Sequence, residues 1–374
     1  MIYLNYAATS YPKPACVIEA YNESINALPS AQFRSAGIFD NSDLFDETRQ
    51  LLGTLLGISE YNNIYFASGS TDGLNRIIGG LGFEADEYIT TATEHNSVLR
   101  PLFNLGQNRE PVIVPCDKDG IVNADVLESM ICEKSKVLIV NHSSNVTGAI
   151  QDVEAFGKIA KKHGLRFVLD VSQSAGCIPI KADEWGVDAL AFTGHKSIMG
   201  VQGTGGYYVR SNMKLKPLLY GGTGKDSTRI KYENDYEYEV GTQNSSGIAA
   251  LNAAVKYVLS KDIELIHSVE NEKMNYLVNE LKTIDNLILY GGKLKNRGPV
   301  ISFKLKDFAP ADLAYILQSS YGIITRAGLQ CAPLIHQHMG TEKEGTLRVS
   351  ISDETTREEI DALINALREI AKAV

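Results

Sequence analysis

Short apolar runs alternate with amphipathic stretches through roughly the first two thirds of the chain. The runs are rich in β-branched and aromatic side chains, which is typical of strands buried on both faces. We expect such strands at residues 63–67, 87–91, 111–114, 136–140, 166–170, 187–192 and 207–210. Helical spacing of apolar residues predicts helices at 46–56, 71–81 and 154–163. This alternation predicts a mainly parallel sheet covered by helices on both faces.

The pattern changes after about residue 246. Two long helical runs, 248–260 and 266–281, precede apolar strands at 299–303, 322–325 and 346–350. A closing helix carries one apolar face, made by Ile360, Leu363, Ile364, Leu367 and Ile370. We therefore expect a large α/β domain over residues 1–250 and a smaller α+β domain over 251–374, with an irregular arm at 1–14 packing against the smaller one.

Composition and charge exclude several functional classes. The chain has 374 residues, 44% of them hydrophobic, and a formal net charge of −9, which disfavours binding of nucleic acid or acidic membranes through bulk electrostatics. No apolar stretch reaches bilayer length, and the N-terminus does not resemble a signal peptide. The five cysteines are scattered and form no C-x-x-C pair. We therefore expect a cytoplasmic protein without disulfides or a zinc site.

Polar side chains follow five of the predicted strands at the point where each strand ends. In open parallel sheets the carboxyl ends of the strands share one edge, and ligands bind there. After residue 67, Ser68-Gly-Ser-Thr-Asp-Gly73 opens a helix whose free N–H groups suit a phosphate, although a plain helix cap would also explain it. The other ends present His95, Asn145, Asp170 with Gln173, and Thr193-Gly-His-Lys196.

This set of side chains suits a phosphorylated aromatic aldehyde. Burial lowers the pKa of a lysine such as Lys196, and a neutral amine condenses with a carbonyl. A carboxylate can keep a ring nitrogen protonated, an imidazole can stack on the ring, and the strand–helix turn can take the phosphate. Pyridoxal 5'-phosphate has such partners, notably a Schiff-base lysine and an acidic group at the pyridine nitrogen. We therefore expect this cofactor.

Four motifs carry a resemblance to a known family. They are Thr93-Glu-His95, Asp170-x-x-Gln173, Thr193-Gly-His-Lys196 and Arg326-Ala-Gly-Leu-Gln-Cys331-Ala-Pro333. With them the chain resembles the class V aminotransferase superfamily, and within it the cysteine desulfurase and selenocysteine lyase family, nearly from end to end. The flanks of Cys331 resemble the short catalytic-cysteine loop of the family's second group. The resemblance implies the fold type I of pyridoxal-phosphate-dependent transferases, with a seven-stranded sheet, and a homodimer with shared active sites.

The resemblance also implies a role for each of these side chains. Lys196 would be the Schiff-base lysine, His95 would stack on the ring, and Asp170 would bind the pyridine nitrogen. Gln173 would face the phenolic oxygen, and Asn145 would help to hold both ring and substrate. The phosphate would be held by Ser70, Thr71, Thr193 and His195, and across the dimer interface by Thr242.

Cys331 separates the expected activity from ordinary transamination. A free cysteine is most often a small buried hydrophobe, and we assign that role to the other four cysteines. By the resemblance, Cys331 would accept sulfur from L-cysteine as a persulfide, leave L-alanine, and pass the sulfur to an acceptor, which could be a protein. Arg348 would bind the substrate carboxylate, with Arg326 as the next candidate. For a lone arginine in a strand, a structural ion pair is the alternative.

Three other functions stay open at this point. They are a selenocysteine lyase acting on L-selenocysteine, a class V aminotransferase, and a cofactor-binding scaffold without turnover. Leu329-Gln330 stands where many relatives have one or two histidines, which bears on sulfur acceptance and on the choice between sulfur and selenium. Asn5 stands where an aspartate is common. His336 and His338 follow Cys331, but one thiolate without a second ligand pair does not predict a metal site.

Overall fold

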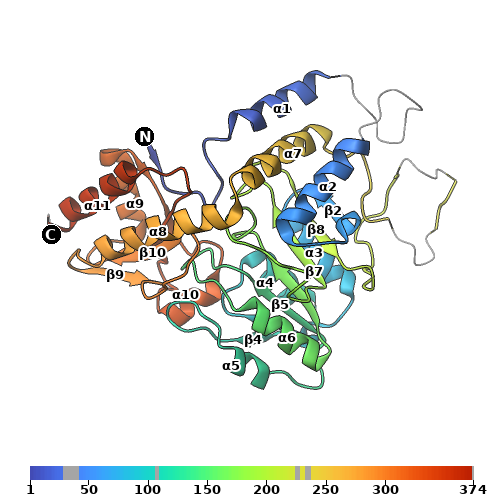
Figure 1. Cartoon of the computed structure of the whole chain (residues 1–374). Coiled ribbons are helices and arrows are strands. Elements are labelled where there is room, and N and C mark those ends of the chain that lie inside the picture. The colour runs from blue at the N-terminus through green and yellow to red at the C-terminus, as the bar shows by residue number, and fades with distance from the viewer. Residues whose placement is uncertain (28–41, 106–108, 224–227, 232–236, 373–374) are drawn as a thin grey trace.

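Seven strands form the central sheet of the computed structural model (Figure 1). The structure describes residues 1–27, 42–105, 109–223, 228–231 and 237–372. Their order is β2-β8-β7-β6-β5-β3-β4. The bounds are β2 (Ile64–Ala67), β3 (Tyr88–Thr91), β4 (Val112–Val114), β5 (Val137–Asn141), β6 (Arg166–Asp170), β7 (Ala189–Thr193) and β8 (Gly205–Val209). Strands β3 to β7 pair in parallel, and β8 pairs antiparallel with β7 and β2. The mainly parallel sheet predicted from the sequence is confirmed.

The direction of the strands brings the carboxyl ends of all strands of this sheet except β8 to one edge. Because β8 is antiparallel to both of its neighbours, β2 runs in the same direction as β7. The ends of β2, β3, β5, β6 and β7 therefore share an edge with the start of β8. A Cβ atom at Gly205, the first residue of β8, would lie 2.7 Å from the Cα atom of Gly69. A glycine at this position lets the turn after β2 pack closely against β8.

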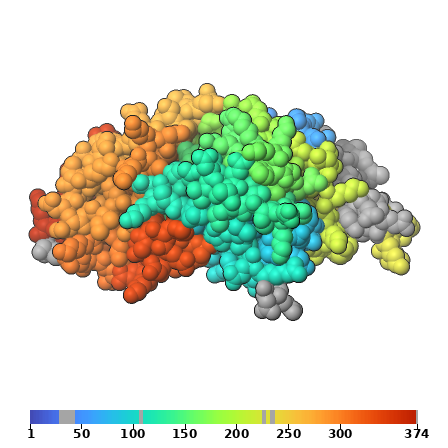
Figure 2. Space-filling view, turned by 90° about the horizontal axis from the view of Figure 1, so that it is seen from below, coloured from blue at the N-terminus to red at the C-terminus, as the bar shows by residue number. Residues whose placement is uncertain are grey.

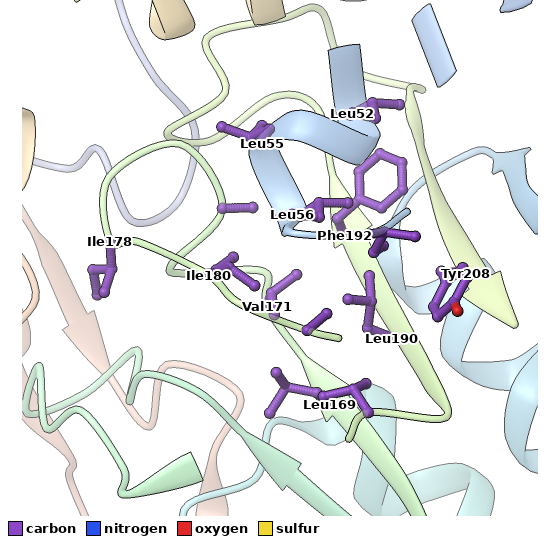
Figure 3. Close-up of a cluster of buried hydrophobic side chains, with 14 of the residues drawn as sticks. Leu52, Leu55, Leu56, Leu169, Val171, Ile178, Ile180, Leu190, Phe192 and Tyr208 are labelled. Carbon is purple, nitrogen blue, oxygen red and sulfur yellow. The ribbon is translucent and has the colours of Figure 1, made fainter. Parts of the chain in front are cut away.

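Helices cover both faces of the sheet. On one face lie α2 (Ser42–Leu56), α6 (Val153–His163) and α7 (Ser245–Ser260), whose apolar residues share a cluster with Leu169, Leu190 and Phe192 of the sheet (Figure 3). On the other face, α3 (Ser70–Leu81) and α4 (Asn96–Leu105) pack on the alternate strand residues, such as Val168 and Ala191. The period of two in each strand thus gives each face its own apolar layer.

The C-terminal part forms a second layer of helices on a smaller sheet. Strands β9 (Leu287–Tyr290), β10 (Val300–Leu305), β12 (Arg326–Gly328) and β13 (Thr346–Ser350) pair in the order β12-β13-β10-β9. Helices α8 (Ile263–Leu281), α9 (Pro310–Tyr321) and α11 (Arg357–Lys372) share an apolar cluster with this sheet. The predicted domain boundary between residues 250 and 251 falls within α7 and stays a prediction.

The N-terminal arm joins the two parts of the chain. Its strand β1 (Ile2–Tyr3) pairs in parallel with β11 (Ile323–Ile324), next to the smaller sheet. The arm then crosses to the large sheet, where Gln173 donates a hydrogen bond to the Ala7 carbonyl (3.0 Å). Seen from below, the orange and red C-terminal part of the chain packs directly against the green and teal part (Figure 2). The carboxyl edge of the large sheet thus faces the smaller sheet and the arm.

Several elements depart from the sequence-based expectation. Helices α1 (Ala15–Asn26), α5 (Ala124–Ser129) and α10 (Pro333–Met339) were not predicted, and neither were α4, α9 and the short strands β1, β9 and β12. The strand expected at 322–325 is wrong in extent, because two separate short strands stand here, β11 (Ile323–Ile324) and β12 (Arg326–Gly328). No helix among the described residues has the length and apolarity needed to cross a membrane.

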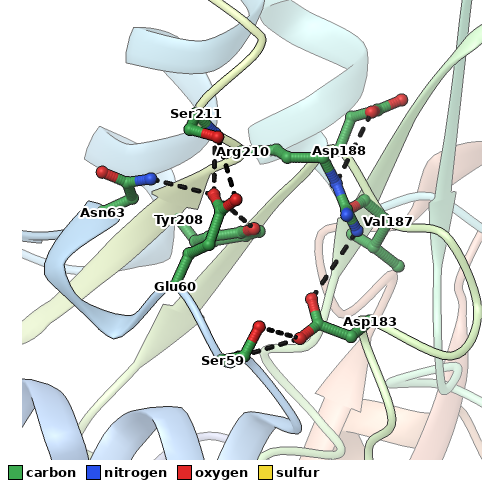
Figure 4. Close-up of polar contacts among 9 residues, drawn as sticks. All are labelled: Ser59, Glu60, Asn63, Asp183, Val187, Asp188, Tyr208, Arg210 and Ser211. Atoms are coloured by element: carbon green, nitrogen blue, oxygen red, sulfur yellow. Dashed lines mark hydrogen bonds and ion pairs between the residues drawn. The ribbon is translucent and has the colours of Figure 1, made fainter.

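A polar network holds the opposite edge of the large sheet (Figure 4). Arg210, just after β8, donates two hydrogen bonds to the Val187 carbonyl (2.8 and 3.2 Å) and lies 3.6 Å from an Asp183 carboxylate oxygen. Glu60 accepts hydrogen bonds from the backbone and the side chain of Ser211, both at 2.8 Å. Arg210 is thus paired with both Asp183 and Asp188 at this edge.

Candidate active site

A cavity of about 410 Å³ opens at the carboxyl edge of the large sheet, which is large enough for a cofactor and a small substrate. The predicted residues that line it are Ser70, Thr71, His95, Asn145, Asp170, Gln173, Thr193, His195, Lys196, Arg326 and Arg348. Cys331 follows Gln330 of the lining, and its Sγ lies 3.5 Å from Nη2 of Arg326. Thr242 is exposed and does not line the cavity of its own chain, so its role stays a prediction.

Lys196 follows the segment Thr193-Gly-His195 and is the third residue after the end of β7. Burial, together with the charges of Arg348 and Arg326, lowers the pKa of Lys196 to about 8 against the opposing effect of Asp170. A substantial fraction of the amine is therefore neutral near pH 8 and available as a nucleophile or a base.

The arm fixes the loop that carries Lys196. The carbonyl oxygen of His195 accepts hydrogen bonds from the backbone and side chain of Ser10 (3.0 and 3.1 Å), from Thr9 (3.1 Å) and from Nζ of Lys13 (3.0 Å). These donors come from residues 9–13, far from β7 in the sequence. The position of the reactive amine is thus determined jointly by β7 and the N-terminal arm.

Asp170 and His95 are each held by a serine two residues later in the chain. Asp170 Oδ1 accepts hydrogen bonds from the backbone N–H (2.9 Å) and the hydroxyl of Ser172. His95 Nδ1 accepts one from the backbone N–H of Ser97 (3.0 Å). Burial, then the charge of Lys196, lowers the pKa of His95 to about 4, so the ring is neutral with its proton on Nε2. A neutral imidazole can stack on the ring of a heteroaromatic cofactor, and a fixed carboxylate can keep the nitrogen of that ring protonated.

The end of the cavity at β2 has the donors that a phosphate needs. Helix α3 begins there at Ser70, so its first N–H groups and the positive end of its dipole face the cavity. Nδ1 of His195 is buried and has no hydrogen-bond partner within the described part of the chain. Such an orphaned buried nitrogen is rare without a ligand or water. These residues fit the phosphate of pyridoxal phosphate.

The other end of the cavity carries two arginines. Arg326 and Arg348 lie opposite each other on β12 and β13. Arg348 is only 1% exposed, and it donates to the Asn145 carbonyl and to Oδ1 of Asn5, each at 3.0 Å. Burial, then the charge of Arg326, lowers the pKa of Arg348 to about 9. Within the described residues neither arginine has a carboxylate partner, so the site favours a ligand with an anionic group.

The supporting roles of the side chains around these residues were not predicted from the sequence. Ser97 and Ser172 carry a recognisable local signal, since a serine two residues after a polar side chain commonly hydrogen-bonds back to it. Glu94 is fully buried, and burial raises its pKa to about 8, so it is largely neutral at pH 7. Asn5, which holds Arg348, carries no local signal because its partner lies at the other end of the chain.

Comparison with known proteins agrees with this geometry. The sequence profile described as aminotransferase class-V matches residues 2–363. The chain belongs to the class-V aminotransferase family. Enzymes of this family depend on pyridoxal phosphate, which agrees with the lysine, carboxylate and phosphate donors at the carboxyl edge. The resemblance described from the motifs is thereby confirmed.

Several relatives of this class-V family member carry the name of the same activity, cysteine desulfurase. A "Probable cysteine desulfurase" of Borreliella burgdorferi is 32% identical, over 100% of this chain and 92% of the relative. One of Methanothermobacter thermautotrophicus is 30% identical over 99% and 94%. The solved apo structure of a cysteine desulfurase from Thermococcus onnurineus NA1 has a TM-score of 0.92 at 29% identity, over 100% of this chain and 95% of that one. The expected fold type I is confirmed.

Proposed function

We propose that this class-V aminotransferase family member is a pyridoxal-phosphate-dependent cysteine desulfurase, which converts L-cysteine to L-alanine and holds the sulfur as a persulfide on Cys331. The observation that supports it most is the thiol of Cys331, 3.5 Å from Arg326, at the rim of the cavity that Lys196 and Arg348 line. Transamination needs no thiol at this place. The names of the relatives support the same activity.

The chain's own residues would hold the cofactor and the substrate. Pyridoxal phosphate, when bound, would supply an electron sink for bond changes at the substrate carbons. Lys196 would anchor it, Asp170 would bind its ring nitrogen, His95 would cover its ring and Gln173 would face its phenolic oxygen. The phosphate would lie at the residues Ser70, Thr71, Thr193 and His195. In a homodimer, the exposed Thr242 would serve the cavity of the partner subunit.

The substrate would lie between Lys196 and the arginines. Arg348 would pair with its carboxylate, and Asn145, whose carbonyl orients Arg348, would line the same space. The neutral amine of Lys196 would take the α-proton at Nζ. The Cys331 sulfur would then bond to the substrate sulfur while the substrate C–S bond breaks. The net products are L-alanine and an enzyme persulfide, so atoms and electrons balance without a further oxidant or reductant.

A sulfur-labelling experiment tests this function. A short pulse of ³⁵S-labelled L-cysteine is expected to place one labelled sulfur, removable by a reductant, on the peptide that contains Cys331, with one L-alanine released per sulfur. The exposed Cys132 serves as the internal control, since its peptide should stay unlabelled. Label on the peptide of the buried Cys177, or alanine released without labelled protein, would contradict the proposal.

The ionisation of Lys196 predicts how the cofactor-free protein captures pyridoxal phosphate. Because the pKa of Lys196 is lowered to about 8, the amine is mainly protonated below that pH and mainly neutral above it. The capture rate, followed by the absorbance of the imine, should rise about tenfold per pH unit up to pH 8 and then level off. Borohydride fixation should mark Lys196 and not Lys13, whose pKa burial also lowers to about 8. A midpoint above pH 10 would show that the amine is not desolvated.

The proposal extends to location and partners. We place the enzyme in the cytoplasm, in line with its free cysteines, and expect it to pass sulfur to an acceptor thiol. Neither nucleic acid nor a membrane is expected as a partner, given the net charge of −9. Selenocysteine lyase activity is distinguished from desulfuration by the Cys331 variant described in the Discussion.

A further inference from the structure

Two successive residues, Gln330 and Cys331, both have a disfavoured backbone conformation. Gln330 and Cys331 have φ angles of 44° and 61°, in the left-handed region that residues with a Cβ atom seldom occupy. Two such residues in succession persist only where surrounding contacts determine them. The contacts that fix this turn therefore also fix the direction in which the Cys331 side chain points.

Backbone contacts hold the turn from the large sheet's side. The Gln330 carbonyl accepts a hydrogen bond from Nδ2 of Asn145 (2.7 Å), and the Cys331 carbonyl accepts one from the backbone N–H of Asn96 (2.7 Å). Asn145 follows β5, and Asn96 begins α4. These two bonds attach the thiol-bearing turn to the part of the molecule that carries Lys196.

The side chain of Gln330 holds the turn from the other side. It is 2% exposed, its Nε2 donates to the Thr346 carbonyl on β13 (2.9 Å), and its Oε1 lies 3.0 Å from Nε2 of His336 on α10. His336 is completely buried, and its Nδ1 lies 2.7 Å from the hydroxyl of Thr341. Gln330 thus connects the turn to both β13 and α10.

The directions of these hydrogen bonds follow from their partners. The Thr346 carbonyl can only accept, so the Gln330 amide nitrogen faces it and Oε1 faces His336. His336 must then donate from Nε2, and its Nδ1 must accept from the Thr341 hydroxyl. Burial lowers the pKa of His336 to about 4, so the ring is neutral at physiological pH. These three side-chain bonds are satisfied by one uncharged arrangement.

We propose that Gln330 and His336, oriented by Thr341, form an uncharged lock that sets the position of the Cys331 thiol and thereby supports the turnover of sulfur substrates but not that of selenium substrates. This proposal rests on the proposed desulfurase activity. Attack on a substrate sulfur requires Sγ of Cys331 at a defined place beside Arg326, whereas the departure of selenium does not need the thiol, as the resemblance to selenocysteine lyases implies. Gln330 and His336 are thus positioning residues, acting on the reaction only through Cys331.

Two variants of the holoenzyme test the lock, each with a matched control. Gln330→Met keeps the length of the side chain and removes its hydrogen bonds; Gln337→Met makes the same change at an exposed position of α10. His336→Phe keeps a flat ring without nitrogen atoms; His338→Phe does so at an exposed position two residues later. Thr341→Val, which removes the bond to Nδ1 and a longer contact of the hydroxyl with the His336 carbonyl (3.5 Å), is the milder variant should the first two fail to fold.

The expected result is a split between substrates. Gln330→Met and His336→Phe should lose at least about tenfold in kcat for L-cysteine while kcat for L-selenocysteine stays within about twofold. Cys331, half-buried in the wild type, should react at least about fivefold faster with iodoacetamide once the turn is released. The two control variants should match the wild type in all three measurements, and Thr341→Val should shift each in the same direction by less.

Other outcomes overturn the proposal. Equal losses with both substrates would show a general structural role, and unchanged L-cysteine turnover would show that the lock is not needed. Unchanged alkylation of Cys331 would show that its position does not depend on these side chains. If wild-type protein takes no sulfur onto Cys331, the proposed function itself fails, which the labelling experiment shows independently of these variants.

Discussion

Cys331→Ala is expected to release no L-alanine from L-cysteine while keeping its cofactor, its fold and its activity on L-selenocysteine. The loss should be on the order of a thousandfold or more in kcat, because a covalent nucleophile has no substitute in the cavity. The change leaves in place the side chains proposed to hold the cofactor, such as Lys196 and Asp170. Turnover with both amino acids and the absorbance of the bound cofactor are the measurements.

The control for this variant is Cys132→Ala, which removes an exposed thiol and should behave as the wild type. Full turnover of L-cysteine by Cys331→Ala would show that the Cys331 thiol takes no part in the reaction. Loss of both activities with the cofactor still bound would show that Cys331 also shapes the cavity, and the preference between sulfur and selenium would then rest on another residue.

Arg348→Ala is expected to keep the cofactor but lose about 30- to 1000-fold in kcat/KM for L-cysteine, equivalent to about 2–4 kcal/mol for a charge-assisted pair. The side chain is buried, two of its nitrogens are held by Asn5 and Asn145, and Nε has no partner within the described residues. Its charge is therefore desolvated and has no carboxylate partner among the described residues. Steady-state kinetics and cofactor absorbance measure the two parts of this prediction.

Arg348→Lys is the matched control for charge. Lysine keeps the positive charge but cannot form the bidentate pair or reach both asparagines, so an intermediate loss is expected. If Arg348→Ala had the kinetics of the wild type, the carboxylate would have to be bound by another residue, with Arg326 on the neighbouring strand as the next candidate.

The parts of the fold that the sequence predicted are those with strong local patterns. Strand β5, buried along its whole length, appears as a continuous apolar run, and α11 shows one clear apolar face. Helix α4, which contains Pro101 and begins with the polar residues Asn96 and Ser97, was not predicted. Helix α9 was missed although Pro310 at its start and Gly322 at its end are common helix signals.

The candidate site was predictable to the extent that strand ends define it. Asp170 ends β6, and Ser70 and Lys196 are each the third residue after a strand, so their meeting at one edge follows from the sheet alone. The bond between Asn5 and Arg348 and the contact between Gln330 and Thr346 depend on how distant segments pack. No local pattern predicts such pairs, because neither partner's neighbours in sequence determine them.

The arm has a consequence for how the protein is made. Asn5 is synthesised 343 residues before its partner Arg348. The strand pairing of Ile2 with Ile323 has a similar separation in time. The large sheet can therefore form during translation, but the end of the cavity with the two arginines is completed only after β13 has emerged. A nascent chain stalled before β13 would have the residues proposed to hold the cofactor and lack Arg348, which is proposed to bind the substrate carboxylate.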